Sequence, residues 1–278
     1  MYNLRACIVA ADEGEPEAMN ELGNAYFFGD GVKEDKLKAA KWYRRAAEQG
    51  HPEAQLNLGC AYDFGEGVEE DKSEAAKWYR KAAEKGHAKA QFNLGNLYYI
   101  GKGVGEDKSE AVKWYRHAAE QGHAEAQYFL GTAYGKGEGV KRDHFESFNW
   151  YQLAAKQGFA QAQTSLGYKY FLGEGVDKDN NESAKWYHKA AEQGDIKAQY
   201  ALGALYQTGH LFGEKDINQA AKWFRMAAEQ GDANSQCSLG MLYALYLGDK
   251  AEAKKWLKLA ANQGNADAQS HLKESAFL

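Results

Sequence analysis

Residues 51–86 read HPEAQLNLGCAYDFGEGVEEDKSEAAKWYRKAAEKG, and the same pattern recurs along nearly the whole chain. A Leu-Gly pair returns every 36 residues, and once after 37, with its glycine at Gly23, Gly59, Gly95, Gly131, Gly167, Gly203 and Gly240. One tryptophan follows each pair, at Trp42, Trp78, Trp114, Trp150, Trp186, Trp223 and Trp256. A repeat of this length predicts a solenoid, because one unit cannot bury its apolar stripe alone and must stack on its neighbours.

Each repeat divides into two helices. The first, over 52–64 in the quoted copy, carries Ala54, Leu58 and Ala61 at helical spacing and ends at a glycine turn. The second runs from about Asp71 to Lys85, where Asp71 is suited to cap the helix start and the next residue is a glycine suited to end it. The predicted fold is all-α, a right-handed superhelical solenoid of about seven 36-residue hairpins with a half-repeat at each end.

The repeat register sets the predicted boundaries within one solenoid domain, 1–278. We expect an N-terminal half-repeat at 1–14, a C-terminal capping helix at 265–278, and repeats at 15–50, 51–86, 87–122, 123–158, 159–194, 195–231 and 232–264. The last helix is expected over 268–277. The sixth repeat has one extra residue and the seventh a loop three residues shorter. Both irregularities could be drift in terminal units or a specialised contact with a partner.

Small residues mark the expected points of close helix contact. Gly59 on the first helix and Ala82 and Ala83 on the second let the two backbones approach, and Trp78 and Tyr79 are expected to fill the wider gaps beside them. A bulky residue at Gly59 or Ala82 is therefore expected to damage folding. The arginine at Arg80 lies four residues before Glu84, which predicts an exposed ion pair on the second helix.

Composition excludes several classes of protein. The net charge is −5 and evenly spread, which argues against a nucleic-acid binder. No apolar run approaches the length that crosses a membrane. The sequence as written shows no secretory signal, which predicts a cytoplasmic protein, or a periplasmic or secreted one if the chain is a trimmed mature form.

No arrangement of residues points to catalysis or to a metal. Cys7, Cys60 and Cys237 are far apart and do not follow the repeat, which argues against a disulfide framework. His51, His87 and His123 recur at one position of three repeats, but ligands of one zinc ion lie about 2 Å from it, whereas packed helices are about 10 Å apart. We therefore expect no catalytic residue, no metal and no cofactor.

The string A-x-x-x-L-G-x-x-Y-x-x-G-x-G-V-x-x-D-x-x-x-A-x-x-W-Y-x-x-A-A-x-x-G resembles the Sel-one-like repeat (SLR) family, a bacterial-type relative of the tetratricopeptide repeats. The resemblance covers essentially the whole chain, in seven copies. It implies a non-enzymatic scaffold or adaptor that binds proteins. A cysteine-rich branch of that family has been linked to β-lactam binding or hydrolysis, but this sequence lacks the paired cysteines that define it.

Comparison of the repeats with one another predicts the binding surface. Positions that pack must be alike in every copy, whereas positions on the inner first helices that face a partner are free to differ. The varied positions predicted to bind a protein or peptide in a concave groove are Phe27, Phe28, Phe64, Phe92, Asn96, Tyr99, Tyr128, Tyr168, Phe171 and Tyr200. Aromatic rings with scattered polar groups suit such a groove, although several rings could instead fill space between repeats.

Three functions remain open at this point. The first is a scaffold or adaptor, expected to be a monomer that binds no nucleic acid and does not span a membrane. The second is a dedicated inhibitor, such as an immunity protein for one toxin or enzyme. The third is a β-lactam-binding or -hydrolysing enzyme of the cysteine-rich branch. Replacement of Phe92 or Tyr128 by Ala is expected to weaken partner binding without loss of helix.

Overall fold

The computed structural model describes residues 4–210 and 213–273, which form sixteen α-helices, one π-helical turn and no strand. The chain divides into two compact units, Met1–Asp143 and His144–Leu278. Unit 1 contains α1 (Leu4–Asp12), α2 (Pro16–Phe28), α3 (Lys36–Glu48), α4 (Pro52–Phe64), α5 (Lys72–Glu84), α6 (Ala88–Ile100), α7 (Lys108–Glu120) and α8 (Ala124–Lys136). Unit 2 contains α9 (His144–Lys156), α10 (Ala160–Leu172), α11 (Asn180–Glu192), α12 (Ile196–Thr208), α13 (Ile217–Glu229), α14 (Ala233–Leu242), η1 (Tyr243–Leu247), α15 (Lys250–Asn262) and α16 (Ala266–Lys273).

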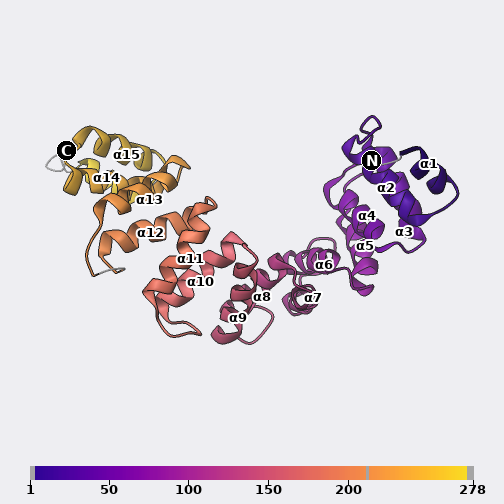
Figure 1. The fold of residues 1–278 in the computed structure, drawn as a ribbon, viewed down its shortest axis with the longest axis horizontal. Helices are drawn as coiled ribbons and strands as arrows, with labels where there is room; N and C mark the ends of the chain where they lie inside the picture. The colour runs from indigo at the N-terminus through magenta and orange to yellow at the C-terminus, as the bar shows by residue number, and fades with distance from the viewer. Residues whose placement is uncertain (1–3, 211–212, 274–278) are drawn as a thin grey trace. The chain divides into compact units, whose positions relative to one another are not determined.

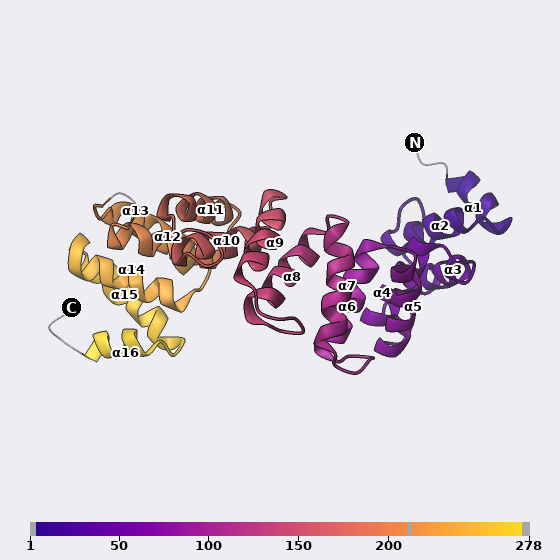
Figure 2. The same cartoon turned by 90° about the horizontal axis from the view of Figure 1, so that it is seen from below.

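Helical hairpins stack in both units, so the predicted all-α solenoid is confirmed. In unit 1 the hairpins α2/α3, α4/α5 and α6/α7 pack in chain order, and each second helix also contacts the first helix of the next hairpin (Figures 1 and 2). Unit 2 repeats this arrangement with α10/α11, α12/α13 and α14/α15. The helix α1 packs on α2, and α16 packs on α15. None of the described helices is long and apolar enough to cross a membrane.

The helix ends follow the sequence closely. The carboxylate of Asp71 accepts hydrogen bonds from the N–H groups of Ser73 and Glu74 at the start of α5. Gly65 closes α4 in the left-handed conformation, with φ of 69°. The histidine row also consists of caps, because His51 Nδ1 accepts from the Ala54 N–H, and the equivalent bonds occur at His87 and His123. A helix-starting role accounts for all three histidines without a metal.

The Leu-Gly glycine is where the two helices of a hairpin come closest. A Cβ on Gly59 would lie 2.6 Å from the ring of Tyr79, a side chain that is fully buried. The same contact joins six glycines to the residue opposite: Gly23 to Tyr43, Gly59 to Tyr79, Gly95 to Tyr115, Gly167 to Tyr187, Gly203 to Phe224 and Gly240 to Leu257. Tyr79 therefore covers the glycine directly, rather than filling a gap beside it.

The second glycine of the inter-helix loop joins one repeat to the previous one. Gly67 has φ of 76°, and a Cβ there would overlap the carbonyl of Lys36 at the start of α3. Gly103 approaches the Lys72 carbonyl in the same way, and Gly139 approaches that of Lys108. The Gly-x-Gly pair thus serves two purposes, since its first glycine ends a helix and its second admits the backbone of the neighbouring repeat.

Buried glutamines form a second connection between repeats. The side chain of Gln91, on α6, donates to the Ala83 carbonyl of the preceding second helix, α5, and accepts, at 2.7 Å, from Gln121 at the end of α7. Gln55, the equivalent of Gln91 one repeat earlier, likewise donates to the Ala47 carbonyl. The position equivalent to Gln121, however, is a lysine in this repeat, Lys85. The ammonium of Lys85 donates to the Gly50 carbonyl, and the buried Oε1 of Gln55 has no hydrogen-bond partner among the described residues.

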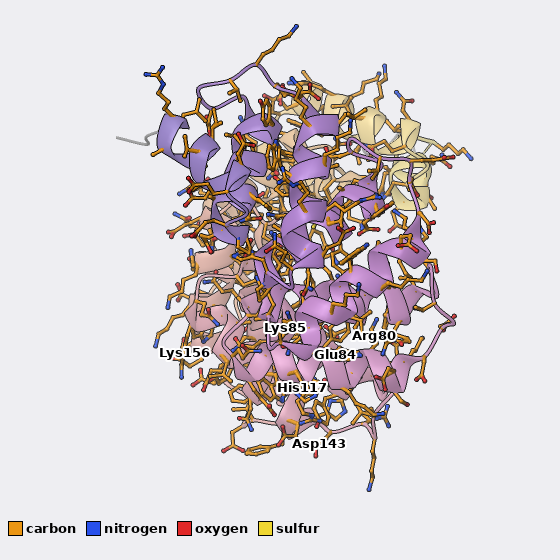
Figure 3. The ribbon with its side chains drawn as sticks, turned by 90° about the vertical axis from the view of Figure 1, so that its right-hand side faces the viewer. Arg80, Glu84, Lys85, His117, Asp143 and Lys156 are labelled. Carbon is orange, nitrogen blue, oxygen red and sulfur yellow. The ribbon has the colours of Figure 1, made fainter. Side chains whose placement is uncertain are left out.

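The arginines of α3, α5 and α7 do not form the expected pairs with the glutamates four residues later. Arg80 and Glu84 both lie on α5 (Figure 3), but Arg80 donates to the hydroxyl of Tyr98 on the next first helix. Arg44 makes the same bond to Tyr62, and Arg116 to Tyr134. The prediction of Arg–Glu pairs is wrong because the neighbouring repeat, absent from a single-helix view, offers a phenol that also stacks beneath the guanidinium.

The C-terminal repeats show how the irregular lengths are accommodated. In the seventh repeat the first helix passes into the π-helical turn η1, which ends at Gly248 with φ of 70°. The wider turn carries the chain directly to Asp249, the N-cap of α15. The capping helix α16 begins at Ala266. The last residues of the expected helix, 274–277, lie outside the described residues, as do 211–212 in the sixth repeat.

Substitution of two glycines that share the left-handed conformation, Gly86 and Gly67, distinguishes the cost of backbone strain from the cost of steric crowding. Gly86→Ala should lower the free energy of unfolding by about 1–2 kcal/mol, because φ is 88° but nothing lies within 4 Å of the new Cβ. Gly67→Ala should lower it by a further 1–3 kcal/mol or so, because the Lys36 carbonyl must also move. Urea denaturation measures both, and equal losses would contradict the inter-repeat role of Gly67.

The unpaired Gln55 oxygen predicts a stabilising substitution. Lys85→Gln should raise the free energy of unfolding by about 1 kcal/mol, because its amide can donate to Gln55 Oε1 as Gln121 donates to Gln91. Lys85→Ala is the control, since it removes the lysine without supplying a donor. The reverse change, Gln121→Lys, should destabilise. If the melting temperature of Lys85→Gln is no higher than that of Lys85→Ala, the hydrogen bond between the two glutamines does not contribute to stability.

Candidate functional site

Two hollows lie along the first helices of unit 1, and together they form the candidate site. The larger, of about 520 Å³, lies between α4 and α6, and the smaller, of about 320 Å³, lies between α2 and α4. Cys60, in the middle of α4, lines both. We call the two together the first-helix groove.

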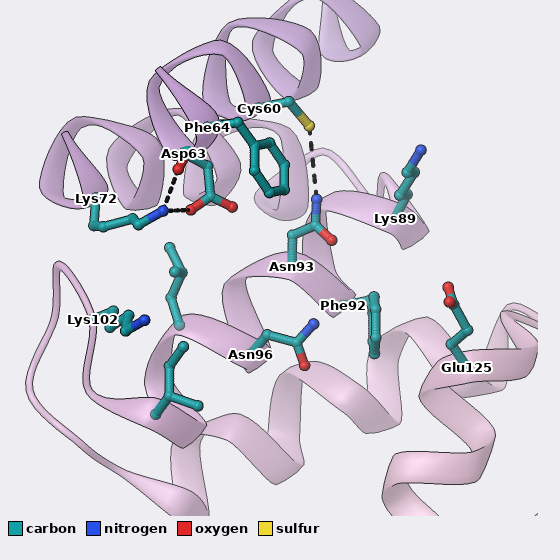
Figure 4. Close-up of a pocket in the computed structure, with 12 residues that line it drawn as sticks. Cys60, Asp63, Phe64, Lys72, Lys89, Phe92, Asn93, Asn96, Lys102 and Glu125 are labelled. Carbon is teal, nitrogen blue, oxygen red and sulfur yellow. Dashed lines mark hydrogen bonds and ion pairs between the residues drawn. The ribbon is translucent and has the colours of Figure 1, made fainter. Parts of the chain in front are cut away.

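The larger hollow combines apolar and charged side chains (Figure 4). Its lining is Cys60, Asp63, Phe64, Lys72, Lys89, Phe92, Asn93, Asn96, Leu97, Ile100, Lys102 and Glu125. Phe64 and Ile100 are the exposed apolar members. On one side, Lys72 Nζ lies 3.0 Å from the Asp63 carboxylate and 3.2 Å from that of Glu70. Such a hollow can take an apolar side chain and offers charged groups beside it.

The smaller hollow is defined by the paired rings of Phe27 and Phe28. Their centroids are 5.0 Å apart in an edge-to-face arrangement, and Lys36 Nζ lies 5.1 Å from the centre of the Phe27 ring. The rest of the lining is Asn24, Tyr43, Glu53, Asn57, Cys60, Ala61 and Glu66. Lys36 also pairs with Glu66 at 2.8 Å, so the ammonium above the ring is already neutralised.

Asparagine amides form the polar floor between the rings. Asn57 donates to the Oδ1 of Asn20 at 3.0 Å and lies 3.4 Å from that of Asn24. The buried tyrosines beneath hold some of these amides, because Tyr43 donates to Asn24 and Tyr115 to Asn96, each at 2.8 Å. Burial raises the pKa of both phenols, so they remain donors. The amides are thereby oriented before any ligand arrives.

The thiol at the centre of the groove is half-buried and in contact with polar side chains. Tyr79 donates to Cys60 Sγ at 3.4 Å, and Asn93 lies 3.9 Å away. Burial raises the pKa of the Cys60 thiol, which keeps it protonated near neutral pH. Cys7, Cys60 and Cys237 are free thiols, and the described residues contain no cluster of three His, Cys, Asp or Glu side chains able to hold a metal.

The structure brings half of the predicted binding residues to this groove. Phe27 and Phe28 line the smaller hollow, and Phe64, Phe92 and Asn96 the larger. Phe28 and Phe64 are open, with 68% and 67% of their surface exposed, whereas Phe92 is only 8% exposed. The Phe92 ring stacks on His123 at 5.0 Å and contacts Phe129 at 5.6 Å. Phe92→Ala would thus damage packing as well as the groove, so Phe64 is the cleaner probe.

The other five predicted residues lie elsewhere. Tyr99 donates to Glu138 at 2.7 Å in the next inter-helix loop, and Tyr128 packs edge-on against Phe129 at 5.5 Å. Tyr168, Phe171 and Tyr200 belong to unit 2, where Phe171 lies against His210 and Tyr200 against Phe224. Whether these five contact a partner stays a prediction.

Sequence reasoning missed the lysines of the larger hollow. Lys72, Lys89 and Lys102 all line it, but they lie outside the varied first-helix positions that predict the groove. A signal was available for Lys102, because the equivalent loop position is acidic at Asp30, Glu66, Glu138 and Glu174. A comparison of charge between repeats would have found it.

Known proteins share both the repeat and the fold. The sequence model of the Sel1 repeat matches residues 16–51, 52–87, 88–123, 124–159, 160–195, 196–232 and 233–265. A protective antigen of uropathogenic Escherichia coli strains that displays an SLR fold is 42% identical, with a TM-score of 0.90 over 97% of this chain. A Sel1 repeat protein from Oxalobacter formigenes is 37% identical, with a TM-score of 0.78 over 98% of this chain.

The chain spans 58% of the solved length of the E. coli antigen and 79% of that of the Oxalobacter protein. A search of the curated proteins finds no match. Because the repeat model matches seven consecutive segments from residue 16 to residue 265, this chain belongs to the Sel1 repeat family.

Proposed function

We propose that the chain is a non-enzymatic scaffold that binds a segment of another protein in the first-helix groove of unit 1. Sel1 repeat proteins generally mediate protein–protein interactions and are generally non-enzymatic. The observation that carries the location is the pair of hollows on either side of Cys60, each lined by an exposed phenylalanine and by asparagine amides. The cytoplasmic location and the monomeric state stay predictions.

The exposed rings and the fixed amides of the groove favour a peptide segment as its ligand. An exposed ring such as Phe28 or Phe64 leaves apolar surface in water that a bound side chain would cover, at roughly 25 cal/mol per Å². Amides that are already hydrogen-bonded, such as Asn24 and Asn96, lose little freedom when a ligand arrives. A rigid floor with protruding rings therefore favours an extended or helical segment over a small substrate.

The proposal predicts that Phe64→Ala weakens partner binding without unfolding the protein. Removal of a ring that is 67% exposed costs little packing but removes apolar contact area, so captured partner should fall by about tenfold, the loss expected when a binding hot spot is truncated. Affinity purification from the native host with quantitative mass spectrometry measures this, and circular dichroism checks the helices.

A matched variant tests the location. Leu37→Ala, on the second helix α3 of the same unit, removes an exposed apolar side chain outside both hollows and should leave capture unchanged. Equal capture by wild type and Phe64→Ala would place the binding surface elsewhere. One tightly bound protein that dominates the eluate would indicate a dedicated inhibitor, whereas several weaker partners would indicate a scaffold.

A further inference from the structure

A pairing of charges recurs where one repeat meets the next. The lysine that opens a second helix lies beside the middle residue of the next Gly-x-Gly loop, so that Lys36 pairs with Glu66 at 2.8 Å and Lys108 with Glu138 at 3.5 Å. In unit 2 the equivalent pair is His144 with Glu174, at 3.4 Å. Three interfaces therefore place a carboxylate at one and the same position.

The interface at the larger hollow departs from this pattern. The equivalent residues are Lys72 and Lys102, so two cations stand where a cation and a carboxylate stand elsewhere. Lys72 turns to Asp63 and Glu70 instead. The ammonium of Lys102 makes no hydrogen bond or ion pair with the residues that the structure describes, and Figure 4 shows it directed toward the other lining side chains.

A second difference between the repeats, at the same interface, accounts for the larger hollow. The position four residues after the Leu-Gly glycine is Phe27 in the first repeat and Tyr99 in the third, and each ring lies near the paired lysine, at 5.1 and 5.2 Å. In the second repeat this position is Asp63. Asp63 neutralises Lys72 but cannot fill the volume of a ring, and the hollow of about 520 Å³ lies there.

The remaining charges of the hollow leave Lys102 unpaired. Lys89 and Glu125 lie on the opposite side and carry opposite charges (Figure 4). Asp63 and Lys72 form a pair. Glu70, outside the lining, also pairs with Lys72 at 3.2 Å, so the charges around the hollow balance in number. Lys102 nevertheless has no ion pair with any described residue, and it lines the hollow together with the exposed ring of Phe64 and the exposed Ile100.

We propose that the larger hollow binds a peptide segment of a partner protein that carries an Asp or Glu side chain next to a large apolar side chain. The carboxylate pairs with Lys102, while the apolar side chain packs between Phe64 and Ile100. A carboxylate is favoured over a phosphate because Lys102 is a single unpaired ammonium, and the nearby carboxylates of Asp63, Glu70 and Glu125 would repel the nearly double negative charge of a phosphate. The inference rests on the proposed function, because it names the ligand chemistry of the same groove.

The test is selection from a random peptide library displayed on phage, with the full chain as bait. Wild type should enrich peptides in which an acidic residue lies within about two positions of Phe, Leu, Ile or Trp, a spacing set by the size of the hollow. Lys102→Glu should lose that preference, because its carboxylate can pair with Lys72 and repels an acidic ligand. Lys41→Glu, the same charge change on α3 outside both hollows, is the matched control.

Affinities of one selected peptide then measure the ion pair. By fluorescence polarisation, wild type should bind the acidic peptide about tenfold more tightly than its Asn or Gln counterpart, which is the usual size of a charged hydrogen bond. The difference should shrink with salt and disappear in Lys102→Glu and in the milder Lys102→Gln. Circular dichroism should show both variants folded.

The outcomes separate the inference from the proposed function. Peptides that bind wild type, fail to bind Phe64→Ala and show no acidic preference would refute the role of Lys102 but leave the groove as the binding surface. If Lys102→Glu still selected peptides with acidic residues, the role of Lys102 would also be refuted. Failure to select any peptide whose binding depends on Phe64 would refute both.

Discussion

The close approach of a glycine to a buried ring determines the geometry of every hairpin in which it is seen. With hydrogen as its side chain, Gly59 lets α4 and α5 come together until the Tyr79 ring lies directly on the helix backbone. No larger residue fits there without displacement of that ring. The tyrosine then uses its hydroxyl to hold Cys60 and Asp63 on the first helix, so one contact sets both the helix spacing and the orientation of groove side chains.

A second set of contacts turns hairpins into a solenoid. Gly67 admits the Lys36 carbonyl of the previous repeat, buried glutamines such as Gln91 connect successive second helices, and Arg80 reaches the Tyr98 hydroxyl one repeat later. Each contact fixes a register between neighbours, which explains why the repeat length stays at 36 through most of the chain. Where the length changes in the seventh repeat, the π-helical turn after α14 absorbs the difference.

The proposed binding surface lies where this regularity is broken. Asp63 replaces a ring and Lys102 replaces a carboxylate at one interface, and that interface contains the larger of the two hollows. Variation alone does not mark a contact residue, however. Phe92 varies between repeats and is nevertheless packed against His123 and Phe129, so it supports the groove more than it faces a partner.

The sequence by itself determined the repeat unit, the helix boundaries and most of the caps, because these depend on residues a few positions apart and on a period repeated seven times. Asp71 and Gly65, for example, act as predicted through local backbone bonds. Only the tertiary structure determined which of the varied side chains are exposed to solvent. The exposure of Phe64, the burial of Phe92 and the isolation of Lys102 each depend on side chains about 30 or more residues away that stacking of the repeats brings together, and no local pattern encodes that neighbourhood.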